Sequence, residues 1–192
     1  MVYDANVLHP ASLRDLLIRL ACTGLYRAKW TNAILDEMTA SLIRANPQLD
    51  PARLDRTRQL MIAAVPDCLV TGYEPLIKAV ALPDKDDRHV AAAAIRCRAQ
   101  IIVTNNLRDF PDSALNQFDI KAQSPDHFVH DLLKTAYDQV VHTITRQAAA
   151  LHRPPQSYNQ LLNRLEQVGL PQTVAAIRHG PHDPPTETPP TL

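Results

Sequence analysis

Residues 87–109 read DRHVAAAAIRCRAQIIVTNNLRD. The first half predicts a helix, because Asp87 stands directly before an apolar, alanine-rich run at residues 90–95. The second half contains residues 101–104, a continuous β-branched run typical of a strand buried on both faces of a parallel sheet. A helix that leads directly into such a strand predicts a parallel sheet covered by helices.

The rest of the first 130 residues repeats this alternation of strand and helix patterns. Strands are expected at residues 1–4, at 68–70 and, more weakly, at 118–121. Helices are expected from about Ser12 to Gly24, from Thr31 or Asn32 onward, and after the dipeptides Asp50-Pro51 and Ser124-Pro125. In each dipeptide the first residue suits an N-cap and the proline suits the first helical position. The predicted fold class is α/β, with helices on both faces of a parallel sheet.

The chain changes character after Asp131. Only helical patterns remain, at residues 133–151, 161–168 and 171–177. We therefore expect a first domain at 1–131 and a helical extension at 132–179. Residues 180–192 are rich in proline and nearly free of apolar side chains, so we expect a disordered tail there.

The apolar stripe of residues 133–151 must be covered, because packing of such a face supplies most of a helix's stability. We expect these helices to fold back on the domain as a hairpin. Part of the groove that they form is expected to receive a cognate partner protein.

Composition limits the setting of the protein. Lys+Arg 20 balance Asp+Glu 20, so a nucleic-acid partner would have to meet a local patch of positive charge. No apolar run is long enough to cross a bilayer, and Asp4 and Asn6 interrupt any signal-peptide pattern. The three cysteines Cys22, Cys68 and Cys97 are widely spaced and are expected to be buried free thiols. The expected location is the cytoplasm.

Four acidic residues adjoin predicted buried segments: Asp4, Glu37, Asp87 and Asp109. A carboxylate in such a place is costly unless it is paired or binds a metal. If the fold brings the four together, a divalent cation is their natural partner, and carboxylates favour Mg²⁺ or Mn²⁺ over zinc. Two such ions can clamp the attacking and leaving oxygens of an in-line displacement, so the pattern indicates a metal-dependent phosphodiesterase.

Each of these acidic residues also has an ordinary structural interpretation. Asp86 or Asp87 would serve as an N-cap, and Asp36 and Glu37 would lie on a solvated helix face. Asp109 would close a turn. Their joint occurrence favours the functional interpretation.

The motifs resemble those of PIN-domain ribonucleases, and most of all the VapC-type toxins of bacterial type II toxin–antitoxin systems. The resemblance rests on residues 4–8 (DANVL), on Glu37, on residues 83–94 (PDKDDRHVAAAA) and on residues 104–111 (TNNLRDFP). They occur in family order and at family-like spacing, and together they cover residues 1 to about 128.

The resemblance implies that Asp4, Glu37, Asp87 and Asp109 are the catalytic acids. It implies Mg²⁺ or Mn²⁺ as cofactor, held by Asp4, Asp87 and Asp109, with Glu37 as a further ligand or as the group that orients water. The implied supporting residues are Asn6, Asp84, Asp86, Thr104 and Asn105, and which of Asp84, Asp86 and Asp87 bind metal stays open.

The activity implied by the family is endoribonuclease cleavage of RNA that leaves a 5′-phosphate and a 3′-hydroxyl. The protein would be a toxin that inhibits translation and growth, its partners would be RNA and a cognate antitoxin, and a homodimer is an open alternative. No membrane partner is expected.

Two other classes of protein compete with this interpretation. A phosphatase of the haloacid dehalogenase type also places an aspartate after its first strand, but it needs a second aspartate where this chain has Asn6. A non-catalytic PIN-like scaffold would bind RNA or a protein without cleavage, and the intact set of acids argues against it.

Basic residues that are candidates for RNA backbone contact are spread over several helices. They are Arg14, Arg19, Arg27, Lys29, Arg53, Arg56 and Arg58. Trp30 is expected to pack in the core rather than stack on a base.

Overall fold

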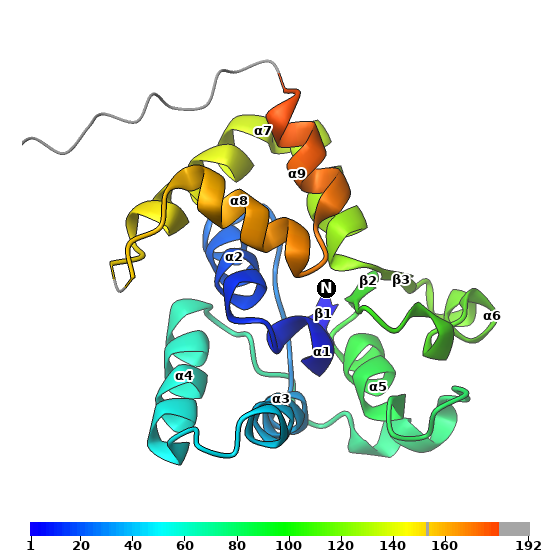
Figure 1. Ribbon diagram of the computed structural model, residues 1–192. Coiled ribbons are helices and arrows are strands. Elements are labelled where there is room, and N and C mark those ends of the chain that lie inside the picture. The colour runs from blue at the N-terminus through cyan, green and yellow to red at the C-terminus, as the bar shows by residue number, and fades with distance from the viewer. Residues whose placement is uncertain (153, 181–192) are drawn as a thin grey trace, which may run out of the picture.

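The computed structural model describes residues 1–152 and 154–180 (Figure 1). Three parallel strands form its sheet in the order β1-β2-β3: β1 is Val2–Tyr3, β2 is Ile101–Val103 and β3 is Lys121–Gln123. Tyr3 pairs with Val103 and Val103 pairs with Gln123. The predicted parallel sheet is therefore confirmed, with β2 at its centre.

Two single parallel bridges extend the sheet beyond β1. Val2 is bridged to Lys29, and Trp30 is bridged to Leu69. The amide of Trp30 donates to the carbonyl of Cys68 at 2.9 Å, and the amide of Val70 donates to the carbonyl of Trp30 at 2.9 Å. The strand expected at residues 68–70 is thus an edge segment held by one bridge. Trp30 is fully buried and stacks on Tyr3, which confirms that it packs in the core.

Helices flank the sheet, as predicted. Those of the first 123 residues are α1 (Ala5–Leu8), α2 (Ala11–Cys22), α3 (Asn32–Ala45), α4 (Pro51–Ala64), η1 (Glu74–Ala79), α5 (Arg88–Arg96), η2 (Leu107–Asp109), α6 (Asp112–Leu115) and η3 (Asn116–Phe118). The predicted caps form: Thr31 accepts from the amide of Ile34, and Asp50 accepts from the amide of Ala52. Helix α5 packs on both β1 and β2.

The third strand begins later than its sequence pattern predicts. Residues 116–118 form η3, and Asp119 adopts a left-handed backbone with φ of 56°. A strand cannot pass through that conformation, so β3 starts at Lys121 rather than at residue 118. The three cysteines are free, as expected, but only Cys68 is buried; Cys22 is exposed and Cys97 is partly buried.

The C-terminal helices are α7 (Pro125–Ala149), α8 (Tyr158–Gln167) and α9 (Pro171–Arg178). Ser124 caps α7 by accepting from the amide of His127, as predicted. Because α7 begins at Pro125 and ends at Ala149, it runs through the expected domain boundary at residue 131. It kinks at Ala136, where φ is −147° and ψ is 47°.

These helices fold back on the first domain, as predicted. Helix α7 packs against α2 and α9, and α8 also packs against α2 (Figure 1). The side chain of Gln147 donates to the carbonyl of Ser12 at 2.9 Å, and that of Gln139 donates to the carbonyl of Thr23 at 3.2 Å. One core cluster therefore includes residues of both parts.

The tail expected to be disordered lies, from residue 181 on, outside the described residues. Within residues 1–152 and 154–180, no helix combines the length and the apolar character that a bilayer crossing needs.

Candidate metal centre

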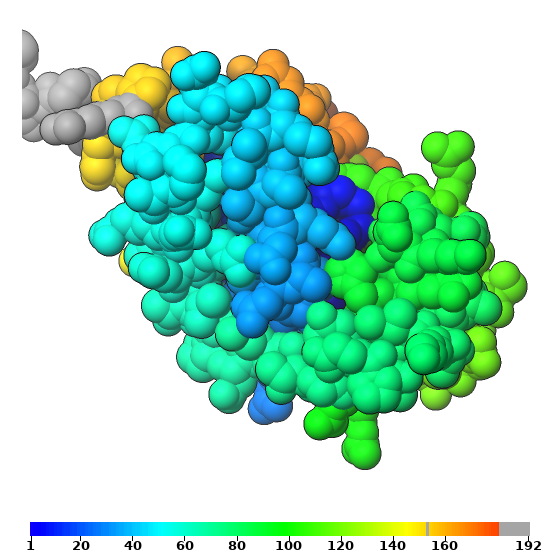
Figure 2. Space-filling model, turned by 90° about the horizontal axis from the view of Figure 1, so that it is seen from below, coloured from blue at the N-terminus to red at the C-terminus, as the bar shows by residue number. Residues whose placement is uncertain are grey.

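The polar residues singled out in the sequence gather where β1 and β2 end. Asp4 directly follows β1 and Thr104 directly follows β2, and parallel neighbours end at the same edge of a sheet. Viewed from below, the dark blue N-terminal segment is visible in a hollow between the lighter blue of α3 and the green segments around α5 (Figure 2). The site is therefore open to solvent on this face.

A hydrogen-bond network holds Asp4 in place. Asp4 is 4% exposed, and its Oδ2 accepts from Thr104 Oγ1 at 2.6 Å and from Asn6 Nδ2. Asn6 Nδ2 also donates to Thr104 Oγ1 at 3.0 Å, and Asn6 Oδ1 accepts from the amide of Asn105 at 3.0 Å. Burial raises the pKa of Asp4; the Thr104 hydrogen bond works against this effect, and the charge of Glu37 adds to it.

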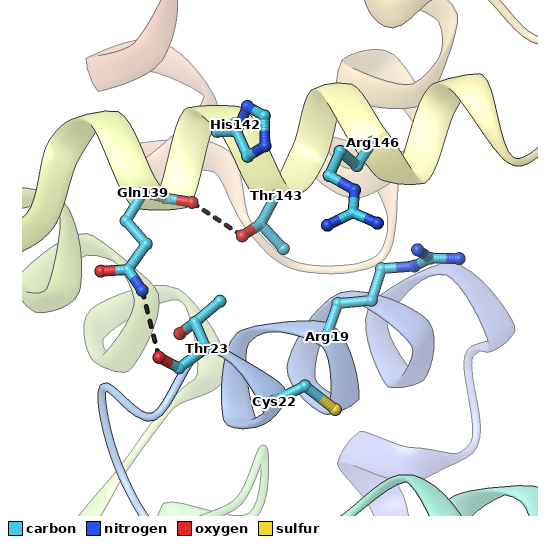
Figure 3. A pocket seen from close by; sticks show the side chains of 7 residues that line it. All are labelled: Arg19, Cys22, Thr23, Gln139, His142, Thr143 and Arg146. Atoms are coloured by element: carbon cyan, nitrogen blue, oxygen red, sulfur yellow. Dashed lines mark hydrogen bonds between the residues drawn. The ribbon is translucent and has the colours of Figure 1, made fainter.

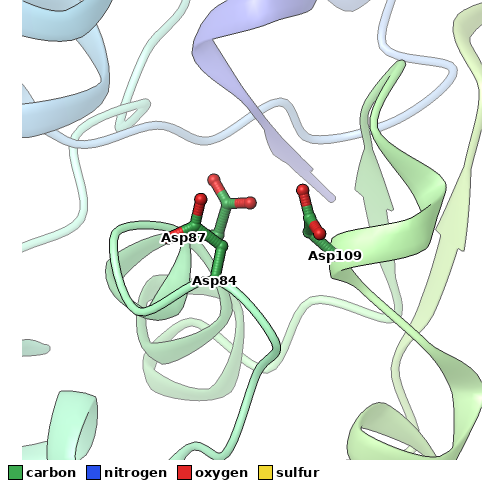
Figure 4. Close-up of side chains that lie close together, drawn as sticks. All are labelled: Asp84, Asp87 and Asp109. Carbon is green, nitrogen blue, oxygen red and sulfur yellow. The ribbon is translucent and has the colours of Figure 1, made fainter.

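Three carboxylates face one another beside this network (Figure 4). Asp84 and Asp87 come from the segment that leads into α5, and Asp109 comes from η2 on the other side. One carboxylate oxygen from each lies within 4.8 Å of the others. These residues could hold a metal ion with Asp4 close by, since Asp4 is among the charges that act on Asp87.

Asp87 does not cap the helix that it precedes. It stands at the N-cap of α5, yet its side chain makes no capping hydrogen bond. Its Oδ2 is buried and has no hydrogen-bond partner among the described residues. Burial, together with the charges of Asp4, Asp84, Asp109 and Glu37, raises its pKa to about 6.

Such a carboxylate fits a divalent cation. A buried oxygen without a partner, next to other carboxylates, is energetically costly. A hard cation that prefers oxygen ligands would offset the charge repulsion and supply the missing partner.

Glu37 lies across from this group on α3. Its Oε1 is 2.8 Å from Nε2 of His89, the second residue of α5. The Glu37 side chain is 47% exposed and the His89 side chain 12% exposed. Only the packing of α5 against the sheet reveals that His89 meets Glu37.

The other predicted supporting residues divide into two groups. Asp84 joins the carboxylate cluster, whereas Asp86 is exposed and only its amide approaches the cluster, donating to Asp84 Oδ1 at 2.8 Å. Asn105 contributes its backbone amide rather than its side chain. The sequence reasoning missed Asn106, whose side-chain amide donates to Asp109 Oδ2. Its spacing of three residues before Asp109, in a turn, is the signal that could have identified it.

Four of the seven basic residues proposed for RNA contact have partners within the protein: Arg14, Arg19, Lys29 and Arg58. The Arg14 guanidinium donates to the carbonyls of Leu8 and His9 at 2.6 and 3.2 Å, so it closes the end of α1. Arg58 is paired with Asp36. These contacts occupy only some of the donors of Arg14 and Arg58, so RNA contact by either residue stays a prediction.

Each part of the chain matches a family model. The family model described as PIN domain matches residues 1–108, and the model described as VapC50 C-terminal domain matches residues 125–179. A curated protein named "Putative ribonuclease VapC50", from Mycobacterium tuberculosis (strain ATCC 25618 / H37Rv), is 44% identical over 108 residues. That alignment covers 56% of this chain and 62% of the relative, less than two thirds of its length. No solved structure matches significantly.

Proposed function

Because the chain belongs to the PIN-domain family, whose model matches more than half of it, we propose that it is a metal-dependent endoribonuclease. The observation that carries the proposal is Asp87: a carboxylate that caps nothing, has a pKa raised to about 6 and faces Asp84 and Asp109. We further propose the toxin role in a toxin–antitoxin pair, which the resemblance to the mycobacterial relative supports.

In this proposal Asp87, Asp109 and Asp4 hold the cation, and Asp84 joins them. A bound Mg²⁺ or Mn²⁺ would neutralise the acidic cluster and withdraw negative charge from the phosphodiester that is attacked. Asn6 and Thr104 keep the Asp4 carboxylate in one orientation through their hydrogen bonds. Such supporting groups commonly change metal affinity or activity by roughly 10- to 100-fold when removed.

Glu37 is proposed to orient the attacking water. It is the most exposed of the four acids, and its contact with His89 restricts where its carboxylate can point. No side-chain nucleophile is needed, and the expected products are a 5′-phosphate and a 3′-hydroxyl.

The arrangement disfavours the phosphatase alternative. That chemistry needs an acid two residues after the nucleophile, and here Asn6 donates its amide protons to Asp4 and Thr104. An amide cannot exchange a proton with a leaving group at neutral pH.

The decisive experiment is RNA cleavage by the purified protein with Mg²⁺, with Mn²⁺ and with EDTA, for the parent and for Asp4→Asn. Removing the charge of a ligand should abolish cleavage while the shape of the side chain, and so the fold, is kept. Asp36→Asn is the matched control, since Asp36 neighbours Glu37 but pairs with Arg58 away from the cluster. Full activity of Asp4→Asn would overturn the site, and parent cleavage in EDTA would overturn the metal dependence.

The toxin role has a separate test. Expression of the parent in bacteria should arrest growth, expression of Asp4→Asn should not, and co-expression of a small protein from the adjacent reading frame should restore growth. Growth that is unaffected by an active parent enzyme would leave the nuclease without the toxin role.

A further inference from the structure

A cavity lies between the two matched parts of the chain, away from the acidic cluster. It has a volume of about 400 Å³ and lies between α2 and α7 (Figure 3). Thr23, at the C-terminal end of α2, lines it, whereas the N-terminal end of α2 follows Asp4 and α1. Helix α2 has 12 residues and is therefore about 18 Å long. The cavity and the acidic cluster thus lie toward opposite ends of this helix.

The lining of this cavity is cationic. Arg19 from α2 and Arg146 from α7 both contribute, and His142 adds an imidazole (Figure 3). Arg19 Nε is 2.9 Å from Asp15 Oδ2, which leaves its two terminal amino groups for another acceptor. The Arg146 guanidinium has no partner among residues 1–152 and 154–180, and no carboxylate lines the cavity there. Planar guanidinium groups of this kind match the oxygens of a phosphate.

A second cavity of about 610 Å³ adjoins the first at Cys22, which lines both. It adds Arg27 and Lys29, and the ammonium of Lys29 is held by the carbonyl of Asp67. Asp67 is the one acid among the described residues that line either cavity. The far-side cationic band, defined as Arg19, Arg27, Lys29 and Arg146, therefore spans two adjoining hollows.

A band of this kind suits a chain of phosphates better than one small anion, because charges repeated along a surface neutralise charges repeated along a backbone. The formal net charge of the protein is zero, so this local excess is not a consequence of the overall composition. The first cavity also lacks any large apolar side chain. An amphipathic segment of an inhibitor would need such a surface, so the groove expected to receive an inhibitor is not this one.

We propose that the far-side cationic band is a binding site for the phosphate backbone of RNA, built jointly by the PIN domain and the C-terminal helices. This binding site rests on the proposed ribonuclease function. It adds to that function the kind of substrate: RNA long or folded enough to reach from the acidic cluster to the opposite end of α2. The C-terminal helices then take part in substrate binding, with Arg146 as their main contribution.

The test measures binding, without cleavage, of a fluorescein-labelled stem–loop RNA of mixed sequence in EDTA by fluorescence anisotropy over a range of salt concentrations. The variants are Arg146→Gln and the double variant Arg19→Gln/Arg146→Gln. Each lost phosphate contact should lower the slope of log affinity against log salt by about 1, and the double variant should bind about tenfold more weakly. Arg146→Lys keeps the charge and should retain most of the affinity.

Arg178→Gln is the matched control. Arg178 lies on α9, carries the same charge, and is engaged with Glu166 and Asn163 outside both cavities. Arg146→Gln alone decides the matter if the double variant does not fold, since no contact of the described residues depends on that guanidinium.

Loss of affinity in the band variants with an unchanged control supports the proposal. Unchanged affinity in the band variants, an equal loss in the control, or no RNA binding by the parent would each overturn it. So would RNA binding that persists while binding of a glutamate-rich peptide is lost, because the band would then be a protein-binding site. If RNA binds through the band but the protein never cleaves it, the proposed ribonuclease activity is overturned, whereas the proposed RNA-binding site is kept.

Discussion

Two roles compete for the Asp87 carboxylate, helix capping and membership of the acidic cluster, and only the second is filled. As the residue before α5 it would ordinarily bond to the helix amides, but its carboxylate is directed instead to the cluster with Asp84 and Asp109. The helix forms without this cap because residues 90–94 are fully buried against the sheet. The packing of the helix thus leaves Asp87 available for other chemistry.

The raised pKa of Asp87 makes a prediction about pH. Its pKa is about 6 in the folded protein and about 3.9 in an unfolded chain. Between these values the folded state binds more protons, so the metal-free protein becomes less stable as pH rises toward 6 and stays so above it. After allowance for solvent screening at this half-exposed group, the loss is roughly 1 kcal/mol, or about 2–4 °C in Tm.

Thermal unfolding of the metal-stripped protein at pH 5 and at pH 8 measures this effect. Tm should be higher at pH 5 for the parent, and the difference should shrink in Asp87→Asn. A parent whose Tm is highest at pH 8 would contradict the raised pKa.

Metal addition makes a second prediction at the residue scale. A cation that binds only the folded cluster stabilises it by about 2.7 kcal/mol at a hundred times its Kd. Unfolding measured with EDTA and with millimolar Mn²⁺ should show a clear rise in Tm for the parent. Asp87→Asn should show a much smaller rise, and Asp36→Asn should match the parent. Equal rises in all three proteins would place the metal elsewhere.

At the scale of elements, α7 and α9 are joined by one buried carboxylate. Asp126, in the first turn of α7, is 5% exposed and accepts from the amides of Gln172 and Thr173 at 3.0 and 2.9 Å. The hydroxyl of Thr173 returns a hydrogen bond to the carbonyl of Asp126 at 3.1 Å. One residue therefore caps α9 and fixes where it docks.

Asp126→Ala should lower the free energy of unfolding by about 1–3 kcal/mol, because it leaves the amides of Gln172 and Thr173 without their acceptor. Urea denaturation measures this loss. Asp131→Ala is the control: it lies on the same helix, pairs with Lys134 near the surface, and should change stability by less than about 0.5 kcal/mol. Equal effects of the two substitutions would mean that Asp126 does not join the helices.

At the scale of the whole molecule, the question is whether the two matched regions are separable. We propose residue 131 as the boundary between the two regions of the sequence. This boundary does not separate two independent bodies, because helix α7 crosses it and the C-terminal helices cover α2. The apolar clusters of the two regions are continuous, which favours a single cooperative unit.

A chain that ends at Asp131 should therefore expose the apolar face of α2. We expect it to bind a hydrophobic dye, to associate in size-exclusion chromatography and to melt at a lower temperature than the parent. A chain that ends at Ala150 should behave no better, because α8 and α9 complete the cover. If the first truncation stays monomeric and equally stable, the helices are an independent arm.

The sequence by itself determined what depends on neighbouring residues. The caps at Thr31, Asp50 and Ser124, the strand after α5 and the helical C-terminal region all follow from local patterns. So does the presence of carboxylates just after buried strands, from which metal chemistry was inferred. These features are local because backbone hydrogen bonding and side-chain periodicity act over a few residues.

Only the tertiary structure decided which side chains meet. Thr104 is 100 residues from Asp4 and 98 from Asn6 in the chain, and the register of β1 on β2 brings it to both. The inclusion of Asp84, the freedom of Asp87 from capping and the contact of Glu37 with His89 arise in the same way. The cavity between Arg19 and Arg146 exists because α7 folds back on α2. Contacts of this range depend on strand register and helix packing, which no local pattern in the sequence encodes.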